Sequence, residues 1–272
     1  MYDFADDVAV ELTPRADVDG RHHAPHAVLT ALELPRWIGE YSTSRILDGA
    51  LTRTPIVHGR LDVGQGRPVL VLPGFAANDQ MTGRLRGHLK SRGFRVHGWR
   101  LGRNIGLTDR LVDGLTERFE QVADQYDQPI SIVGWSFGGV LARRLAHEHT
   151  ERVARIVCLG SPWRADGERT RATGMFERSR EKHGISDRAL DLVTRLREPV
   201  PVPTTAIYSR TDGIVPWQGC RVDERAEPLA ENVEVLSSHM GMVANPLVLR
   251  LVVDRLRRDV AVAAPVPVVV TA

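Results

Sequence analysis

The sequence predicts an α/β protein with a mainly parallel central sheet and helices on both of its faces. Short apolar runs alternate along the chain with longer amphipathic segments, a pattern typical of parallel strands joined by helical crossovers. The clearest unit is residues 130–148, where an apolar, β-branched run passes through a glycine-rich turn into apolar residues at helical spacing. A chain of 272 residues that is 42% hydrophobic is long enough to bury the core of such a domain.

The individual elements follow from the same periodicities. Residues 1–26 look loose, and residues 27–53 have the apolar spacing of a helix that precedes the alternating core. We expect strands at 56–63, 69–72, 94–99, 130–133, 153–159, 202–208 and 232–238, and helices at 79–91, 109–125, 140–148 and 246–258.

Three parts of the chain are predicted to differ in organisation. Residues 1–54 form an N-terminal extension with a packing helix, residues 55–258 form the α/β domain, and residues 259–272 form an apolar tail. Residues 163–200 interrupt the alternation of the α/β domain, because they are polar, arginine-rich and helix-like. They are therefore interpreted as an insertion in the domain.

The turn at 134–138 has the sequence pattern G-x-S-x-G, with Ser136 at its centre. A serine that attacks a carbonyl carbon must lie at the tip of a sharp strand-to-helix turn. Gly134 and Gly138 permit both the backbone strain and the close approach of strand and helix. The helix that follows directs its N-terminal N–H groups toward a developing oxyanion. The alternative is an ordinary glycine-rich turn with a surface serine.

With this strand, turn and helix, the chain resembles the lipase/esterase-like branch of the α/β-hydrolase superfamily over roughly residues 55–257. The resemblance implies an α/β-hydrolase fold, in which residues 163–200 would be a short cap or lid. It also implies a catalytic triad in the chain order serine, acid, histidine. No cofactor is expected, and the sequence has no metal-ligand spacing.

Asp212 and His239 occupy the places that this order requires. Asp212 follows the strand at 202–208 and precedes Gly-Ile-Val-Pro, which would shield its carboxylate. His239 lies between the strand at 232–238 and the last helix, where the family carries its histidine. The alternatives are a solvated Asp-Gly turn and one unremarkable histidine among ten. The agreement of three separate elements in type and order favours a Ser136–His239–Asp212 triad.

The resemblance also implies two backbone donors for an oxyanion. One is the N–H of Phe137, directly after the nucleophile. The other is the N–H of Phe75, in the loop that follows the strand at 69–72. The family often has His-Gly before this donor, whereas this chain has Pro-Gly. Because the donor is a backbone group, this departure does not remove it.

These residues lead us to interpret the protein as a serine carboxylic-ester hydrolase with an acyl-enzyme intermediate, acting on a small-molecule or lipid ester with an apolar acyl group. An acyltransferase or a thioesterase would use the same triad. A non-catalytic binding protein is a third alternative, although such proteins usually lose a triad member. The candidate pocket residues, each with core packing as the alternative, are Met81, Trp135, Trp163, Met175, Val215, Met240 and Met242.

Composition excludes several other classes of protein. A formal net charge of +2 gives no case for nucleic-acid binding, and two cysteines make no disulfide framework. The acidic N-terminus does not have a secretory signal, and no apolar run approaches a membrane span, so a cytoplasmic location is expected. The helix-like segment 27–53 is expected to pack on the sheet edge. Peripheral membrane contact stays open, although its polar face is not strongly basic.

Overall fold

Six parallel strands form one sheet in the order β2-β1-β3-β4-β5-β6. The computed structural model describes residues 25–52, 63–163, 178 and 198–258. The strands are β1 (Pro68–Leu72), β2 (Arg95–Gly98), β3 (Ile130–Trp135), β4 (Val153–Leu159), β5 (Thr204–Tyr208) and β6 (Ala230–Glu234). The predicted parallel α/β architecture is therefore confirmed.

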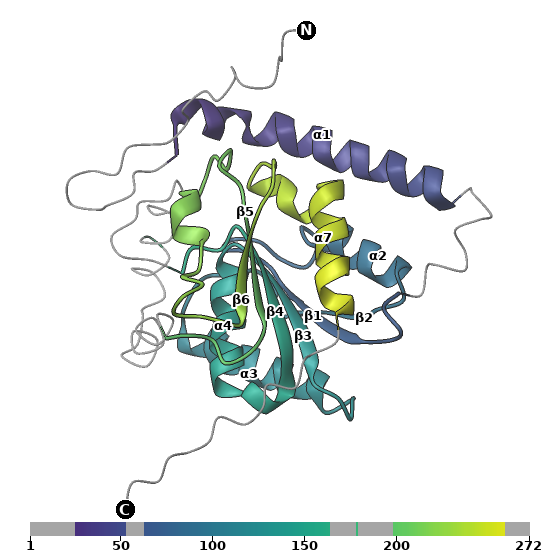
Figure 1. Ribbon diagram of the computed structural model, residues 1–272, viewed down its shortest axis with the longest axis vertical. Coiled ribbons are helices and arrows are strands. Elements are labelled where there is room, and N and C mark those ends of the chain that lie inside the picture. The colour runs from purple at the N-terminus through teal and green to yellow at the C-terminus, as the bar shows by residue number, and fades with distance from the viewer. Residues whose placement is uncertain (1–24, 53–62, 164–177, 179–197, 259–272) are drawn as a thin grey trace, which may run out of the picture.

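Helices cover both faces of the sheet, as predicted. α3 (Asp109–Ala123) and α4 (Phe137–Glu148) lie on one face, and α2 (Gly83–Ser91) and α7 (Pro246–Arg257) lie on the other (Figure 1). The largest differences from the predicted bounds are at the start of α2, expected at residue 79, and at the end of β6, expected at residue 238. The carboxylate of Asp79 accepts the N–H groups of Trp99 and Arg100, which holds this residue in a turn ahead of the helix.

One helix lies elsewhere than expected. α1 (Ala27–Thr52) does not pack on an edge strand but lies over the loops at the carboxyl ends of the strands, across the top of the molecule in Figure 1. The reason is polar rather than apolar contact, because its side chains bond the loops that follow β5 and β6. The helix also exposes several large apolar side chains: Val28, Leu32, Leu34, Ile38, Tyr41, Ile46 and Leu47.

Several predictions lie outside the described residues. They concern the N-terminal stretch, the strand at 56–63 apart from its last residue, the cap apart from its two ends and the tail at 259–272. The division of the chain into three parts therefore stays a prediction. Within the described ranges, no helix is long and apolar enough to cross a membrane.

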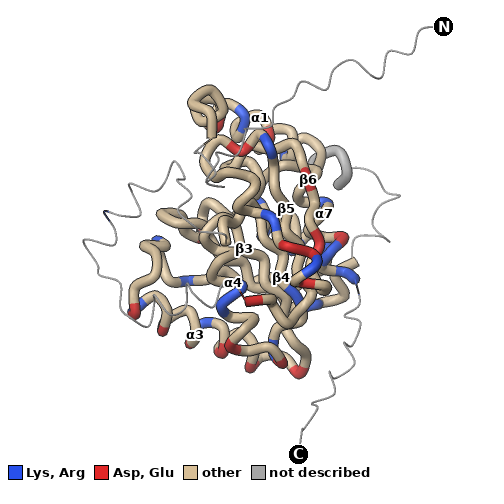
Figure 2. The backbone as a smooth tube through the Cα atoms, turned by 60° about the vertical axis from the view of Figure 1, so that its left-hand side comes forward, with Lys and Arg blue, Asp and Glu red and all other residues tan. Residues whose placement is uncertain are grey.

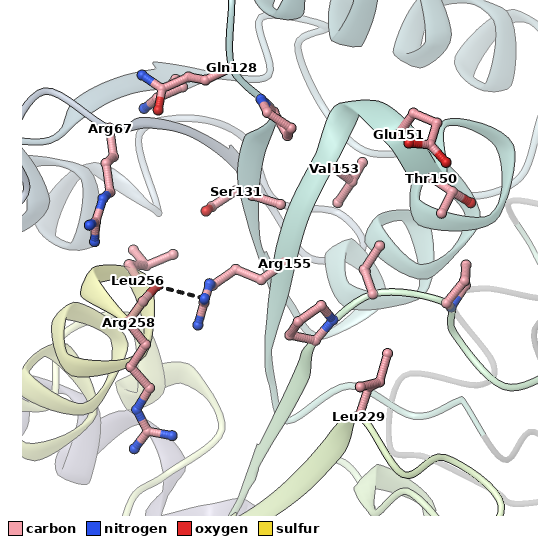
Figure 3. A pocket seen from close by; sticks show the side chains of 16 residues that line it. Arg67, Gln128, Ser131, Thr150, Glu151, Val153, Arg155, Leu229, Leu256 and Arg258 are labelled. Carbon is pink, nitrogen blue, oxygen red and sulfur yellow. Dashed lines mark hydrogen bonds between the residues drawn. The ribbon is translucent and has the colours of Figure 1, made fainter. Parts of the chain in front are cut away.

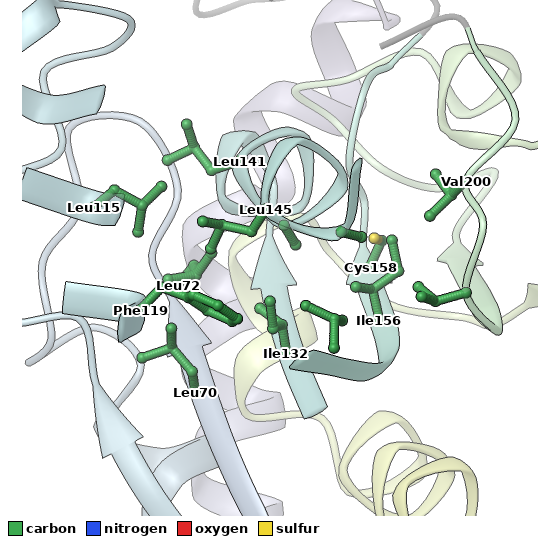
Figure 4. Close-up of a cluster of buried hydrophobic side chains, with 14 of the residues drawn as sticks. Leu70, Leu72, Leu115, Phe119, Ile132, Leu141, Leu145, Ile156, Cys158 and Val200 are labelled. Atoms are coloured by element: carbon green, nitrogen blue, oxygen red, sulfur yellow. The ribbon is translucent and has the colours of Figure 1, made fainter. Parts of the chain in front are cut away.

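The sheet separates two apolar cores. Along β1, Leu70 and Leu72 face α3 and α4, whereas Val69 and Val71 face α2 and α7. Strands buried on both faces are apolar throughout, which is why their sequences stand out as continuous apolar runs. Figure 4 shows the first core, where side chains of the two helices cover those of the sheet; they include Leu115, Phe119, Leu141, Leu145, Ile132, Ile156 and Cys158.

Charged residues of both signs are interspersed along the described backbone (Figure 2). One group of them lies between β6 and α7. Arg255 bonds Glu231 at 2.6 Å, and Arg258 bonds both Glu231 and Asp254. Such half-exposed pairs contribute little stability individually, about 0–1 kcal/mol.

A buried ion pair joins α4 to the loop before β6. The Arg143 guanidinium is 3.0 Å from the Glu227 carboxylate, and the two side chains are only 1% and 9% exposed. Glu227→Ala is expected to lower the free energy of unfolding by about 3–5 kcal/mol, because it leaves a buried cation without its counter-charge. Urea denaturation measures the change. The exposed helix residue Glu117 supplies the control, and a loss no larger than that of Glu117→Ala would contradict the expected role.

Candidate active site

Ser136 joins β3 to α4 in a strained conformation. Its φ of 53° and ψ of −125° lie in a region that residues with a side chain rarely adopt. The surrounding backbone holds it there, since Ser136 N–H donates to the Leu159 carbonyl at 2.7 Å and Gly139 N–H donates to the Ser136 carbonyl at 2.9 Å. The side chain is half-buried at the carboxyl end of the central strand. The turn is thus as sharp as its sequence pattern predicts.

The two glycines that flank this turn have no room for a side chain. A Cβ on Gly134 would lie 2.4 Å from the backbone of Gly138, and a Cβ on Gly138 would lie 2.4 Å from the Leu72 carbonyl oxygen. A third glycine brings in the loop after β1, because a Cβ on Gly74 would lie 3.0 Å from the Cβ of Ser136. The backbone of the Phe75 loop therefore lies directly against the serine.

Asp212 and His239 lie together as the sequence predicts. The Asp212 Oδ2 and His239 Nδ1 atoms are 2.6 Å apart, and the side chains are 1% and 4% exposed. The other carboxylate oxygen, Oδ1, accepts the N–H groups of Ile214 and Val215 at 2.8 and 2.7 Å. Asp212 is therefore a buried, fully engaged acceptor and not a solvated turn residue.

β3 and the loop after β4 both contact this pair. The Trp135 indole N–H donates to the His239 carbonyl at 3.0 Å, and the two rings are 5.9 Å apart. A Cβ on Gly160, at a φ of 55°, would lie 3.2 Å from both Asp212 Oδ2 and His239 Nδ1. The carboxyl ends of three neighbouring strands, β3, β4 and β5, thus lie against the loop after β6 that carries His239.

Electrostatics favour a basic imidazole. Burial lowers the pKa of His239, but the charge and hydrogen bond of Asp212 and the charge of Glu33 outweigh it, so that the pKa is raised above its ordinary value. Because an ionised carboxylate can only accept, the Nδ1 atom facing Asp212 carries a proton and the Nε2 atom is left as the base.

Sequence reasoning missed the contribution of α1 to this site. Glu33 is 4% exposed and accepts N–H groups from two loops. One is the acid loop, which follows β5 and carries Asp212, and the other is the histidine loop, which follows β6 and carries His239. Glu40 accepts the N–H and the hydroxyl of Ser238, at 3.0 and 2.6 Å. No sequence signal could have identified them, because a glutamate on a helix ordinarily belongs to its solvated face.

The seven candidate pocket residues lie at different depths. Met240, beside the histidine, is half-buried, and Met81 is 42% exposed. Met175 lies outside the described residues. The remaining four are buried among other apolar side chains: Trp135, Trp163, Val215 and Met242. Their role as pocket walls stays a prediction.

A cavity of about 500 Å³ lies at the opposite, amino-terminal edge of the sheet (Figure 3). Arg155 lines it and donates to the carbonyls of Arg255 and Arg258, at 2.7 Å each. This arginine therefore holds the end of α7, and the cavity is separate from Ser136. Within the described ranges, no group of three or more histidine, cysteine, aspartate or glutamate residues is arranged to hold a metal ion.

Comparisons with known proteins agree with this fold. The family described as the alpha/beta hydrolase fold matches residues 115–174, which include the Ser136 turn. One of the metagenome-derived lipolytic enzymes LipS and LipT superposes with a TM-score of 0.59 at 19% identity, covering 72% of this chain and 95% of the other. The chain therefore has the α/β-hydrolase fold.

Two further proteins to which the chain is similar are a lipase and an esterase. Lipase B of Aspergillus fumigatus has a TM-score of 0.55 at 19% identity, with 72% of this chain and 54% of that one covered. A pimeloyl-[acyl-carrier protein] methyl ester esterase of Nitrosomonas europaea is 33% identical over 98 residues. The match spans 36% of this chain and 38% of the length of that relative.

Proposed function

We propose that this protein is an α/β-hydrolase of the serine type, a carboxylic-ester hydrolase that acts on esters with an apolar acyl group. The observation that carries the proposal is the buried 2.6 Å contact between Asp212 and His239 at the sheet edge where the strained Ser136 turn lies. A histidine oriented by a buried carboxylate is the base that activates a serine in acyl transfer. The Nitrosomonas europaea relative, named as a methyl ester esterase, supports an ester as the bond that is cleaved.

In the proposed mechanism, Ser136 Oγ attacks the ester carbonyl while His239 Nε2 takes its proton. The negative charge on the carbonyl oxygen is stabilised by the N–H groups of Phe75 and Phe137. Collapse of the tetrahedral intermediate expels the alcohol, which receives the proton from His239, and leaves an acyl group on Ser136. Water then attacks this acyl-enzyme while His239 takes a proton from the water. His239 returns that proton to Ser136 Oγ as the bond to the acyl group breaks, which releases the acid and restores the free serine.

A fluorophosphonate probe and a series of p-nitrophenyl esters from acetate to palmitate test the proposal. Labelling of the purified protein at Ser136 together with ester turnover would support it. The chain-length profile would show how long an acyl group the site accepts.

Hydrolysis of thioesters without hydrolysis of oxygen esters would show that the protein is a thioesterase instead. Transfer of the acyl group to an added alcohol in preference to water would show that it is an acyltransferase. Folded protein that neither labels nor turns over esters would overturn the proposal.

A separate prediction concerns Asn104, which supports the loop of the proposed donor Phe75. Asn104 is fully buried, and its Nδ2 donates to the Pro73 carbonyl at 2.9 Å. Its backbone exchanges hydrogen bonds with Ala76 and Ala77, at 2.7 and 2.8 Å. Ala76 has a φ of 61°, so the loop conformation is strained and depends on these contacts.

Asn104→Ala is expected to lower kcat roughly 10- to 100-fold with a smaller change in KM, because a misplaced donor weakens binding of the transition state more than of the substrate. Steady-state kinetics measure both constants. Asn232→Ala is the matched control, since this amide also bonds a backbone loop, at Val222, but belongs to β6. Equal losses of kcat in the two variants would show that Asn104 only supports the fold.

A further inference from the structure

The polar side of α1 meets the two loops that carry the acid and the histidine. The Glu33 Oε1 atom accepts the N–H of Gly213 at 2.7 Å and the N–H of His239 at 2.9 Å. Its Oε2 atom accepts the N–H of Met240 at 3.0 Å. One buried carboxylate thus bonds the residue after Asp212, the histidine itself and the residue that follows it.

We infer that Glu33 is a positioning residue of the catalytic machinery. Its carboxylate holds the acid loop and the histidine loop side by side, so that Asp212 contacts the imidazole. This inference rests on the proposed triad and adds to it a residue that lies 206 positions before the histidine. Glu33 acts through the backbone of both loops and does not contact the imidazole.

The strength of these contacts favours a fixed geometry. Hydrogen bonds from N–H groups to an ionised carboxylate are about twice as strong as neutral ones, and three of them converge on Glu33. Because the group is buried, losing the carboxylate would leave the three N–H donors without an acceptor. The two loops would then be free to separate, which lengthens the contact between Asp212 and His239.

Other residues of α1 support the same attachment. Thr30 Oγ1 donates to the Gly213 carbonyl at 2.6 Å, and Arg36 donates to the Thr211 carbonyl at 2.6 Å. Glu40, two turns further along, bonds Ser238 and reaches the side chain of Asn245 at 3.2 Å. The helix therefore contacts both sides of the proposed acid–base pair, and among the α1 side chains that the structure describes Glu33 is the one bonded to both loops at once.

Charge gives Glu33 a second effect, which a packing role would not produce. The charged groups that act on the His239 imidazole are Asp212, from the acid loop, and Glu33, from α1. Glu40 bonds the neighbouring Ser238, and Arg36 bonds the acid loop at Thr211.

Burial lowers the pKa of His239, whereas Asp212 and then Glu33 raise it. Removing the Glu33 charge therefore lowers this pKa. Since the base must be neutral to accept the serine proton, activity would then persist to lower pH.

The first variant, Glu33→Gln, keeps the side-chain shape and removes the charge. Its single amide oxygen can replace only one of the two carboxylate oxygens. We expect kcat to fall about tenfold with KM nearly unchanged. We also expect the acidic limb of the kcat/KM profile to move to lower pH. Glu40→Gln is the comparison, because it removes a carboxylate from the same helix and the same loop without contacting His239. It is expected to lower thermal stability without moving the acidic limb.

The second variant, Glu33→Asp, keeps the charge but shortens the reach by one methylene, so it decides the matter if Glu33→Gln does not fold. We expect a similar loss of kcat with an acidic limb close to that of the wild type. Circular dichroism establishes that each variant is folded at the assay temperature. A wild-type kcat in Glu33→Asp, or a wild-type kcat and pH profile in Glu33→Gln, would overturn the inference.

Labelling by the fluorophosphonate separates this inference from the proposed function. Wild-type protein that labels at Ser136 and hydrolyses esters, with Glu33 variants that match it, would overturn the role of Glu33 alone. Wild-type protein that is folded but neither labels nor turns over esters would overturn the triad, and the role of Glu33 with it.

Discussion

Ser136→Ala is expected to abolish labelling by a fluorophosphonate and to lower kcat for p-nitrophenyl esters by roughly 10⁶-fold, the scale on which a serine hydrolase loses its nucleophile. The substitution removes the one oxygen that could form the acyl-enzyme, so no part of the proposed mechanism can proceed through it. Residual hydrolysis would come from the oxyanion donors and from substrate binding alone. Stopped assays at high enzyme concentration measure this background.

The strained turn itself should survive this substitution. Two backbone hydrogen bonds hold this turn, from the Ser136 N–H to the Leu159 carbonyl and from the Gly139 N–H to the Ser136 carbonyl, and neither involves the hydroxyl that the substitution removes. The Tm of Ser136→Ala is therefore expected to stay within a few degrees of that of the wild type.

Ser131→Ala provides a matched control for the nucleophile. Ser131 lies on the same strand, is buried, and lines the cavity at the amino-terminal edge. We expect this variant to label and to turn over esters like the wild type. Labelling of Ser136→Ala, or turnover by it within tenfold of the wild type, would place the nucleophile on another residue.

The site residues that could be predicted are those with a local or topological signal. The Ser136 turn was predictable because its constraints are all local: an apolar strand, two glycines without room for a Cβ, and a helix. Asp212 and His239 were predicted from the serine, acid, histidine order that the resemblance implies. Their places after two strands agree with it, since the carboxyl ends of parallel strands meet at one edge of a sheet. Their 2.6 Å contact is the geometric outcome of that arrangement.

Glu33 and Asn104 could not have been predicted in the same way. Glu33 reaches the acid loop from 180 residues away, and its helix has exposed apolar side chains that suggest a different orientation. Asn104 contacts Pro73 from an irregular segment with no periodicity. Their roles depend on tertiary contacts between distant segments, and nothing in the sequence of either segment indicates that the two lie together.

Apolar residues near the site were ambiguous for a physical reason. Burial in a core and contact with a substrate's acyl chain both favour large apolar side chains. Residue type and position in the sequence therefore cannot distinguish a pocket residue from a core residue. Trp163 illustrates this, because its indole N–H bonds the Arg221 carbonyl and its ring lies 5.1 Å from the Arg143 guanidinium. These contacts explain its burial without reference to a ligand.

Asp212→Asn is expected to lower kcat about 10⁴-fold with little change in KM, because an amide can donate to Nδ1 and thereby stabilise the wrong tautomer of His239. In that tautomer the proton lies on Nε2, which can no longer accept the proton of Ser136. The loss of the negative charge also removes the stabilisation of the imidazolium that forms during attack. Steady-state kinetics and the rate of fluorophosphonate labelling both report the effect, and both should fall together.

Asp223→Asn is the matched control, since Asp223 also lies in a turn and accepts a backbone N–H, that of Arg225, but is exposed. We expect it to retain full activity. If Asp212→Asn kept its kcat within tenfold of the wild type, the imidazole would have to be oriented by the contacts of the His239 backbone with Trp135 and Glu33 alone. That result would reject Asp212 as the acid of the triad. A 10⁴-fold loss, with KM and thermal stability little changed, would instead assign Asp212 to the tautomer and charge of His239 rather than to substrate binding.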